Sequence, residues 1–255
     1  MHNNINSDLK NDFFETNKRG KKNKRAPKRE NIQQQINFDL RKILPKTKNQ
    51  IRTFDEYEIG NHLLLQGVAG TGKTFISLYL ALNEVLSGKS EKKKVVIVRS
   101  VVPTRDMGFL PGSQKEKQKV YEAPYYSIFA ELFGRGDAYE YLKTKGVVDF
   151  ISTSYIRGLT LTDSIIVVDE MQNLSFHELD SIVTRIGLNT RILFCGDFRQ
   201  SDLEWQGDRR GILDFMRVIN TIGAFKTISF DEDDIVRSKL VRDYILAKLE
   251  LGIFT

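Results

Sequence analysis

Cysteine and long apolar runs are scarce in this 255-residue sequence, and each shortage excludes a class of protein. Cys195 is the only cysteine, so the chain has neither a disulfide framework nor a thiolate metal site. No run of about 18 apolar residues occurs, so we expect no segment to span a membrane. The first residues are polar, unlike those of a secretory signal, and we therefore expect a cytoplasmic protein.

Positive charge is concentrated at the N-terminus. Residues 1–30 hold nine Lys or Arg and four Asp or Glu, which accounts for +5 of the net charge of +6. Residues 1–35 contain few aliphatic side chains, so they cannot bury enough apolar surface to offset the entropy lost on ordering. We expect a disordered basic tail over 1–35 and one folded domain over 36–255. The tail is either a phosphate-binding arm for RNA or DNA or a solubilising segment without a partner.

A P-loop motif, G-x-x-x-x-G-K-[ST], occupies Gly67, Val68, Ala69, Gly70, Thr71, Gly72, Lys73 and Thr74. An apolar run precedes it and a helical pattern follows, as the motif requires. The glycines let backbone N–H groups turn inward around phosphate, at the positive end of the next helix. Lys73 is expected to contact the β- and γ-phosphate oxygens, and Thr74 to hold Mg²⁺. The alternative is a helix-capping turn with Lys73 in solvent.

A run of β-branched residues at 165–168 leads directly into two acids, Asp169 and Glu170. This is the Walker B pattern, in which a buried parallel strand presents carboxylates beside the P-loop. Asp169 is expected to anchor Mg²⁺, and Glu170 to orient and polarise the attacking water. The alternative is that both acids cap the helix that begins near Ser175.

Apolar strands and amphipathic helices alternate along the rest of the chain. Strands are expected at 94–99, 147–151, 191–196 and 225–230, and helices at 47–58, 117–133, 138–143, 176–185 and 211–220. The acidic residues 231–234 suit the first turn of a last helix that starts at Ile235. The alternation indicates an α/β fold with a doubly wound, mainly parallel sheet, and the nucleotide at the carboxyl ends of its strands.

Two further side chains have roles that the spacing leaves open, and a third is interpreted as structural. Gln200 follows a strand end, where it either contacts the γ-phosphate or the attacking water, or is an ordinary loop amide. Arg237 is either an arginine finger or a solvated helix residue, and spacing alone favours the second. Cys195 is interpreted as a buried small hydrophobic side chain and not as a reactive thiol.

Eight segments carry a family resemblance: Thr47–Gln50, Gly67–Thr74, Val98–Ser100, Gly108–Gly112, Tyr155–Gly158, Val168–Asn173, Gly196–Gln200 and Asp234–Ser238. Their order resembles the PhoH family of phosphate-starvation-inducible P-loop ATPases, most closely its versions from tailed phages. The Gly-Phe-Leu-Pro-Gly and Asp-Ile-Val-Arg segments are far more specific than the P-loop. One departure is Asp-Glu-Met-Gln at 169–172, where the family usually has Asp-Glu-Ala-Gln.

The PhoH domain is similar to the first motor domain of superfamily 1 helicases, and this resemblance implies a helicase-like P-loop NTPase with ATP and Mg²⁺ as cofactors. Gln50 then resembles an adenine-reading glutamine, and Gln172 and Gln200 resemble γ-phosphate sensors. Arg237 resembles the arginine that stabilises transition-state charge. RNA or single-stranded DNA is the implied partner, and the host cytoplasm is the implied location if a phage encodes the chain.

Only 18 residues follow Arg237, too few for the second motor domain of those helicases. We therefore expect a neighbouring subunit to complete the site in a homo-oligomer, with a hexameric ring as the expected form. Three functions compete: an ATPase that remodels RNA or single-stranded DNA, a nucleotide-gated scaffold with little turnover, and a P-loop kinase. The kinase is disfavoured because Glu170 suits the activation of water.

The basic tail leads to the first prediction. Deleting residues 1–30 removes nine cationic side chains, so the affinity for single-stranded RNA or DNA should fall. The slope of log affinity against log salt should also become shallower, by about 0.7 for each phosphate that the tail no longer neutralises. Fluorescence anisotropy of a labelled oligonucleotide over a salt series measures both quantities. If the affinity and the slope survive the deletion, the tail is a solubilising segment.

Overall fold

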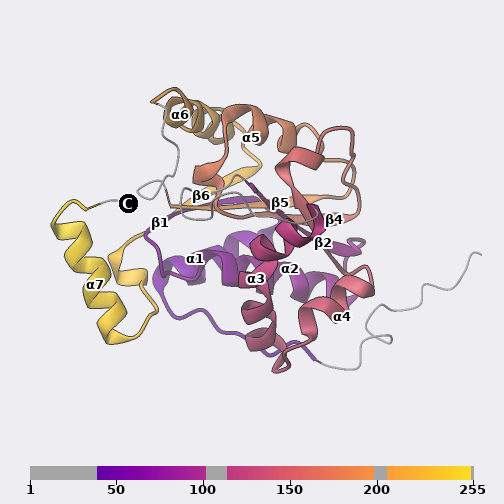
Figure 1. Cartoon of the computed structure of the whole chain (residues 1–255), viewed down its shortest axis with the longest axis horizontal. Helices are drawn as coiled ribbons and strands as arrows, with labels where there is room; N and C mark the ends of the chain where they lie inside the picture. Colours follow the sequence, from indigo (N-terminus) through magenta and orange to yellow (C-terminus); the bar gives the residue numbers. More distant parts are fainter. Residues whose placement is uncertain (1–38, 102–113, 198–205, 254–255) are drawn as a thin grey trace, which may run out of the picture. The chain divides into compact units, whose positions relative to one another are not determined.

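The computed structural model describes residues 39–101, 114–197 and 206–253 of the chain (Figure 1). The predicted basic tail, the Gly108–Gly112 motif and Gln200 lie outside these residues. The elements follow in the order α1 (Lys48–Ile59), β1 (His62–Gly67), α2 (Lys73–Ser87), β2 (Lys94–Arg99), α3 (Gln114–Phe133), α4 (Ala138–Thr144), β3 (Val148–Ser152), η3 (Thr153–Tyr155), β4 (Ser164–Val168), η4 (Met171–Asn173), α5 (Phe176–Val183), β5 (Arg191–Gly196), α6 (Gln206–Thr221), β6 (Phe225–Phe230), η5 (Glu232–Asp234) and α7 (Lys239–Glu250).

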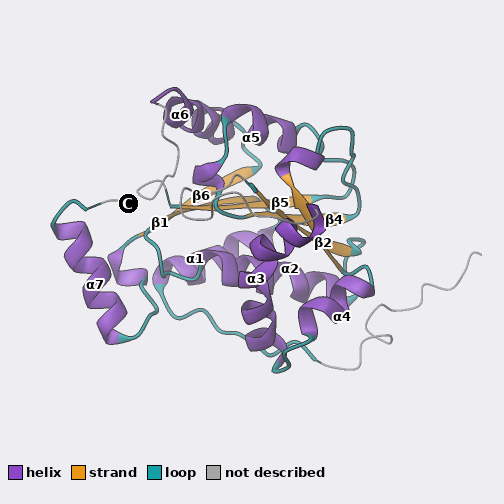
Figure 2. Cartoon of the chain, viewed as in Figure 1, coloured by secondary structure: helices purple, strands orange, loops and turns teal. Residues whose placement is uncertain are grey.

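The strands form one six-stranded sheet in the order β3-β2-β4-β5-β1-β6, and each strand runs parallel to its neighbours. Helices α1 to α4 cover one face, where they pack around residues such as Leu78, Phe129 and Ile97 (Figure 2). Helices α5 and α6 cover the other face, around Phe194 and Phe215. Since both faces are covered, the central strands are continuous apolar runs. The predicted doubly wound α/β fold is confirmed.

Parallel pairing brings the loops that follow the strands to one edge of the sheet. Strand β5 lies between β1 and β4, so the loop after β1, the acids after β4 and the residues after β5 become neighbours. The register aligns Gln66 with Gly196 and Val168 with Phe194. The P-loop and the Walker B acids therefore meet although about 95 residues separate them in the sequence.

Most predicted helix ends lie within three residues of those in the structure, but α6 begins at Gln206 and not at residue 211, and the last helix also begins later than expected. Thr47 caps α1, Gly88 ends α2 and Ser175 caps α5 with Glu178 in a capping box. The last helix starts at Lys239 and not at Ile235, so the prediction for the acidic cluster was wrong.

That acidic cluster forms the short turn η5. The Asp231 side chain accepts from the Asp233 N–H group, and the Asp234 side chain accepts from the Asp231 N–H group. The carboxylates satisfy this local turn, and the extended backbone at Ile235 and Ser238 delays the helix. Among the residues that the structure describes, every helix is too short or too polar to cross a lipid bilayer.

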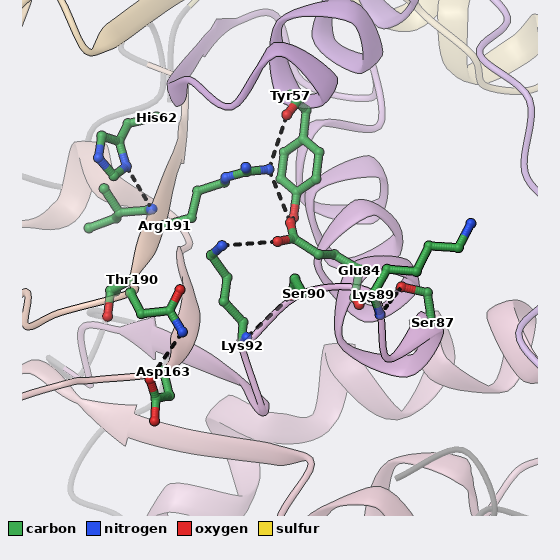
Figure 3. Close-up of polar contacts among 12 residues, drawn as sticks. Tyr57, His62, Glu84, Ser87, Lys89, Ser90, Lys92, Asp163, Thr190 and Arg191 are labelled. Carbon is green, nitrogen blue, oxygen red and sulfur yellow. Dashed lines mark hydrogen bonds and ion pairs between the residues drawn. The ribbon is translucent and has the colours of Figure 1, made fainter. Parts of the chain in front are cut away.

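A charged cluster joins α1, α2 and β5 near the amino end of β5 (Figure 3). The Glu84 carboxylate accepts from Tyr57 Oη at 2.6 Å and pairs with Arg191 Nη1 and Lys92 Nζ, both at 3.0 Å. Arg191 also donates to the Tyr57 carbonyl at 3.0 Å and lies 4.3 Å above the centre of the Tyr57 ring. Burial opposes the charge of Glu84, but the donors from Tyr57 and Lys92 outweigh it and lower its pKa. The cluster fixes α1 against α2, and α1 carries Gln50.

This cluster predicts that Glu84→Gln lowers the free energy of unfolding by about 2 kcal/mol, because two half-buried cations lose their counter-charge. The melting temperature should then fall by about 4–8 °C. Because the pKa of Glu84 is lowered in the folded chain, its contribution is complete above the ordinary pKa of glutamate and disappears as pH falls through the lowered value. The gap to wild type should therefore close in acid. Glu58→Gln, an exposed change on the same α1, is the matched control; an equal loss in both variants contradicts the prediction.

Candidate nucleotide-binding site

The P-loop backbone needs glycine at several positions. Gly67, Gly70 and Gly72 have φ angles of 125°, 79° and 84°, in the region that side chains disfavour. A Cβ atom at Gly67 would also lie 1.9 Å from the Phe230 carbonyl oxygen of β6. Gly72 caps α2 without a side-chain hydrogen bond, so the first-turn N–H groups of α2 have no side-chain cap. Such a helix start suits an anion.

Lys73 is buried within this loop. Its side-chain amine donates to the carbonyls of Gly67 at 2.7 Å and Val68 at 2.8 Å, and only 8% of the residue is exposed. Burial lowers the pKa of Lys73, and Asp197 is the foremost of the anionic groups that oppose this shift. The alternative of a solvated surface lysine is therefore wrong. The amine lies where it can exchange loop carbonyls for phosphate oxygens.

The Asp169 carboxylate joins two helices at the end of β4. Its Oδ1 accepts from Thr74 Oγ1 of α2 at 2.6 Å, and its Oδ2 accepts from Tyr125 Oη of α3 at 2.8 Å. The two expected magnesium ligands are thus in direct contact, and they are the oxygen donors that Mg²⁺ prefers. Within the described ranges no group of three His, Cys, Asp or Glu side chains could hold a metal alone. These residues fit an ion that shares its coordination with substrate phosphate and water.

Glu170 has an unusual backbone conformation, with φ 51° and ψ 44°. A left-handed conformation is strained for a residue with a side chain and is concentrated at functional sites. Burial raises the pKa of Glu170, and the neighbouring Asp169 raises it further. Its carboxylate accepts from the Gln172 amide. The alternative that the acids cap α5 is wrong, because Ser175 and Glu178 fill that role.

The carboxyl end of β5 completes the polar centre with Asp197, to which the sequence assigned no role. Asp197 is 7% exposed, and its N–H group donates to Gln172 Oε1 at 3.0 Å. A Cβ atom at Gly196 would approach that amide oxygen to 2.9 Å, so glycine permits the contact. The one sequence signal for Asp197 is its place directly after a buried strand, as for Asp169. Gln172 thereby links the β4 and β5 ends of the site.

Gln50 and Arg237 both lie against the P-loop. Gln50 Nε2 donates to the Thr71 carbonyl at 3.0 Å, and Gln50 Oε1 accepts from the Lys46 N–H group at 2.7 Å. A Cβ atom at Gly70 would lie 3.0 Å from Arg237 Cγ, and the Val236 N–H group donates to the Gly70 carbonyl at 3.1 Å. The arginine lies beside the P-loop of its own chain.

Asp234 holds the Arg237 segment against the start of α1. Asp234 Oδ2 accepts from Asn49 Nδ2 at 2.7 Å, and Asp234 Oδ1 accepts from the Asn49 N–H group at 3.3 Å. Burial opposes its charge, but the polar groups of Thr47 and Asn49 outweigh burial and lower the pKa of Asp234. Because Gln50 follows Asn49, this one carboxylate connects the two segments that touch the loop.

Other features of this edge have a simpler explanation. The Cys195 side chain is buried, and its Sγ lies 3.1 Å from Ser77 Oγ. Burial raises the pKa of its thiol to about 12. The predicted role as a small buried side chain is confirmed. Arg99 at the end of β2 was missed as a neighbour of the acids. Burial lowers its pKa, but Tyr125 and the two Walker B carboxylates outweigh burial, so the net pKa of Arg99 is raised.

The chain is similar to known proteins of one family. A family model described as PhoH-like protein matches residues 42–248. The PhoH-like protein of Bacillus subtilis (strain 168) is 32% identical over 182 residues, which cover 71% of this chain and 56% of that protein. Protein PhoH of Escherichia coli (strain K12) is 28% identical over 204 residues, which cover 79% and 57%. The chain thus spans little more than half the length of these relatives.

Solved structures resemble the chain more distantly. The large terminase of a thermophilic bacteriophage, in complex with ADP, aligns with a TM-score of 0.45 and 11% identity, over 78% of this chain and 49% of that chain. The Pif1 helicase from Candida albicans aligns with a TM-score of 0.39 and 15% identity, over 82% and 44%.

The Asp234 contacts predict that Asp234→Ala lowers the free energy of unfolding by about 2 kcal/mol, because Asn49 and the Asp231 N–H group lose a buried acceptor. The loss should vanish as pH falls through the lowered pKa of Asp234, since the carboxylate is then protonated in wild type as well. Urea unfolding at several pH values measures this. Asp233→Ala, an exposed change in the same turn, should stay within about 0.5 kcal/mol of wild type. Equal effects of the two changes would sink the explanation.

Proposed function

Because the chain belongs to the PhoH family, we propose that it binds ATP with Mg²⁺ at the P-loop and hydrolyses the γ-phosphate. The observation that carries the proposal is the 2.6 Å hydrogen bond between Thr74 and Asp169. It joins the phosphate-binding loop to the Walker B acids, as a nucleotide–metal site requires. The buried Lys73 amine beside them supports the same conclusion.

Each side chain has a proposed task in in-line attack by water. Lys73 leaves its loop carbonyls for the β- and γ-phosphate oxygens, and Glu170 orients the water and accepts its proton. Burial and the neighbouring Asp169 raise the pKa of Glu170, which makes its carboxylate a stronger base. Arg237 stabilises the charge of the transition state from beside Gly70. Mg²⁺, held by Thr74 and Asp169, would neutralise phosphate charge.

The second part of the proposal is that turnover acts on RNA or single-stranded DNA, as a remodelling ATPase in a homo-oligomer, with a hexameric ring as the expected form. The basic residues 1–30 supply cationic contacts for phosphates. The turn after β3 supports a nucleic-acid contact at the edge of the sheet where the strands end. Its Tyr155 is 48% exposed and Arg157 is exposed, and an aromatic ring with a nearby guanidinium suits stacked bases.

A nucleotide-gated scaffold with little turnover is the second candidate. It is favoured by α7, which has no buried residue and exposes Leu240 at 80% and Tyr244 at 64%. Helix α7 directly follows the segment that carries Arg237, and Ile245 of α7 lies close to Gly70. A nucleotide bound at the P-loop would therefore lie close to the helix that carries the exposed Leu240 and Tyr244 side chains.

Lys73→Ala separates the two candidates. We expect single-stranded RNA or DNA to stimulate ATP hydrolysis by wild type, and Lys73→Ala to reduce the stimulated rate by about 10²–10³-fold, because a charge-stabilising donor is lost. Phosphate release with and without oligonucleotide measures this. Lys89→Ala, an exposed lysine just past α2, is the matched control. Background turnover in all samples, with ATP still bound, contradicts the motor and favours the scaffold.

A further inference from the structure

Tyr125 contributes a hydroxyl group to a site whose other members come from the P-loop and the strand ends. Its side chain is fully buried on α3, and Oη donates to Asp169 Oδ2 at 2.8 Å. The other oxygen of that carboxylate accepts from Thr74. The motifs of the sequence gave no indication of this contact, because Tyr125 lies in none of them.

Packing does not explain the Tyr125 hydroxyl. The Tyr125 ring lies against Tyr139 of α4 and Phe150 of β3, at centroid distances of 6.4 Å and 5.9 Å. Phenylalanine would fill the same volume and make the same ring contacts. A buried hydroxyl costs free energy unless it is hydrogen-bonded, and this one is bonded to the carboxylate that faces the P-loop.

The two donors on Asp169 fix the plane of its carboxylate. A carboxylate with one bonded oxygen can rotate about its terminal torsion, which has a broad energy minimum. With Thr74 on Oδ1 and Tyr125 on Oδ2, that rotation breaks at least one short hydrogen bond between an O–H group and a charged oxygen. The carboxylate is therefore held in one orientation before any ligand arrives.

We propose that Tyr125 is a positioning residue for Mg²⁺: its hydroxyl holds the Asp169 carboxylate in the orientation in which Asp169 and Thr74 share the ion. The inference rests on the proposed function, since it needs Mg²⁺–nucleotide at the P-loop. Groups that hydrogen-bond to metal ligands commonly set metal affinity by 10- to 100-fold. Because Tyr125 packs on α4 and β3, a displacement of α3 would change how Asp169 binds the ion.

Tyr125→Phe tests this on the full chain. The affinity for a fluorescent, non-hydrolysable ATP analogue is measured in EDTA and across a Mg²⁺ titration. We expect the half-saturating Mg²⁺ concentration to rise about tenfold, with the affinity in EDTA unchanged. Tyr126→Phe is the matched control, since the neighbouring hydroxyl donates to Glu140 and not to Asp169. It should behave as wild type.

A double-mutant cycle with Asp169→Asn separates positioning from general disturbance of the fold. In the Asp169→Asn background Tyr125→Phe should cause no further shift, because the carboxylate it orients is gone. An unchanged Mg²⁺ dependence in Tyr125→Phe overturns the inference, as does an equal loss of affinity in EDTA. If wild type bound the analogue without any Mg²⁺ dependence, the proposed function would fail first, and the inference with it.

Discussion

The hydrogen bond between Thr74 and Asp169 is the contact on which the arrangement of the site depends. Thr74 lies at the start of α2, which follows β1, and Asp169 directly follows β4; strand β5 lies between β1 and β4. Neighbouring strands are about 4.8 Å apart, so the ends of β1 and β4 are about 10 Å apart. Helix α2 bridges this gap, because it starts at the P-loop and packs across β5, β4 and β2. Strand order and the direction of one helix thus bring two distant motifs into hydrogen-bonding distance.

The same edge gathers several buried charged side chains. Lys73, Asp169 and Asp197 are all less than 10% exposed. Lys73 begins α2, and the two acids directly follow the apolar strands β4 and β5. Buried charges are stable only when polar groups compensate them. Here the loop carbonyls accept from the Lys73 amine, the hydroxyl groups of Thr74 and Tyr125 donate to Asp169, and the Gln172 amide donates to Glu170. Glu170 has a left-handed, strained backbone conformation where β4 passes into the turn η4. The charged cluster around Glu84 has no such strain and serves to fix helices.

Local patterns predicted much of the fold, and pairs of distant residues account for what they missed. The P-loop and the Walker B strand were predictable because neighbouring residues determine each of them, as they do the cap at Thr47 and the capping box of Ser175 and Glu178. Tyr125 was not, since only the packing of α3 brings it to Asp169. The start of α7 was misplaced because carboxylates in η5 bond to their own turn. The roles of Gln50, Gln172 and Arg237 stay predictions, and Gln200 lies outside the described residues.

The position of Arg237 changes what a neighbouring subunit would have to supply. Its side chain already lies over Gly70 of its own chain, so no second chain is needed to bring an arginine to the loop. Asp234 ties that segment to Asn49, and the next residue, Gln50, bonds to the Thr71 carbonyl. The Thr71 carbonyl thus accepts from Gln50 near the start of α1, and the Gly70 carbonyl accepts from the Val236 N–H group next to Arg237. The Asp234 carboxylate joins these two segments. A shift of Gly70 and Thr71 would change both bonds and the contact of Gly70 with Ile245 of α7. Helix α7 thus connects this loop, through Ile245 beside Gly70, to the exposed side chains of Leu240 and Tyr244.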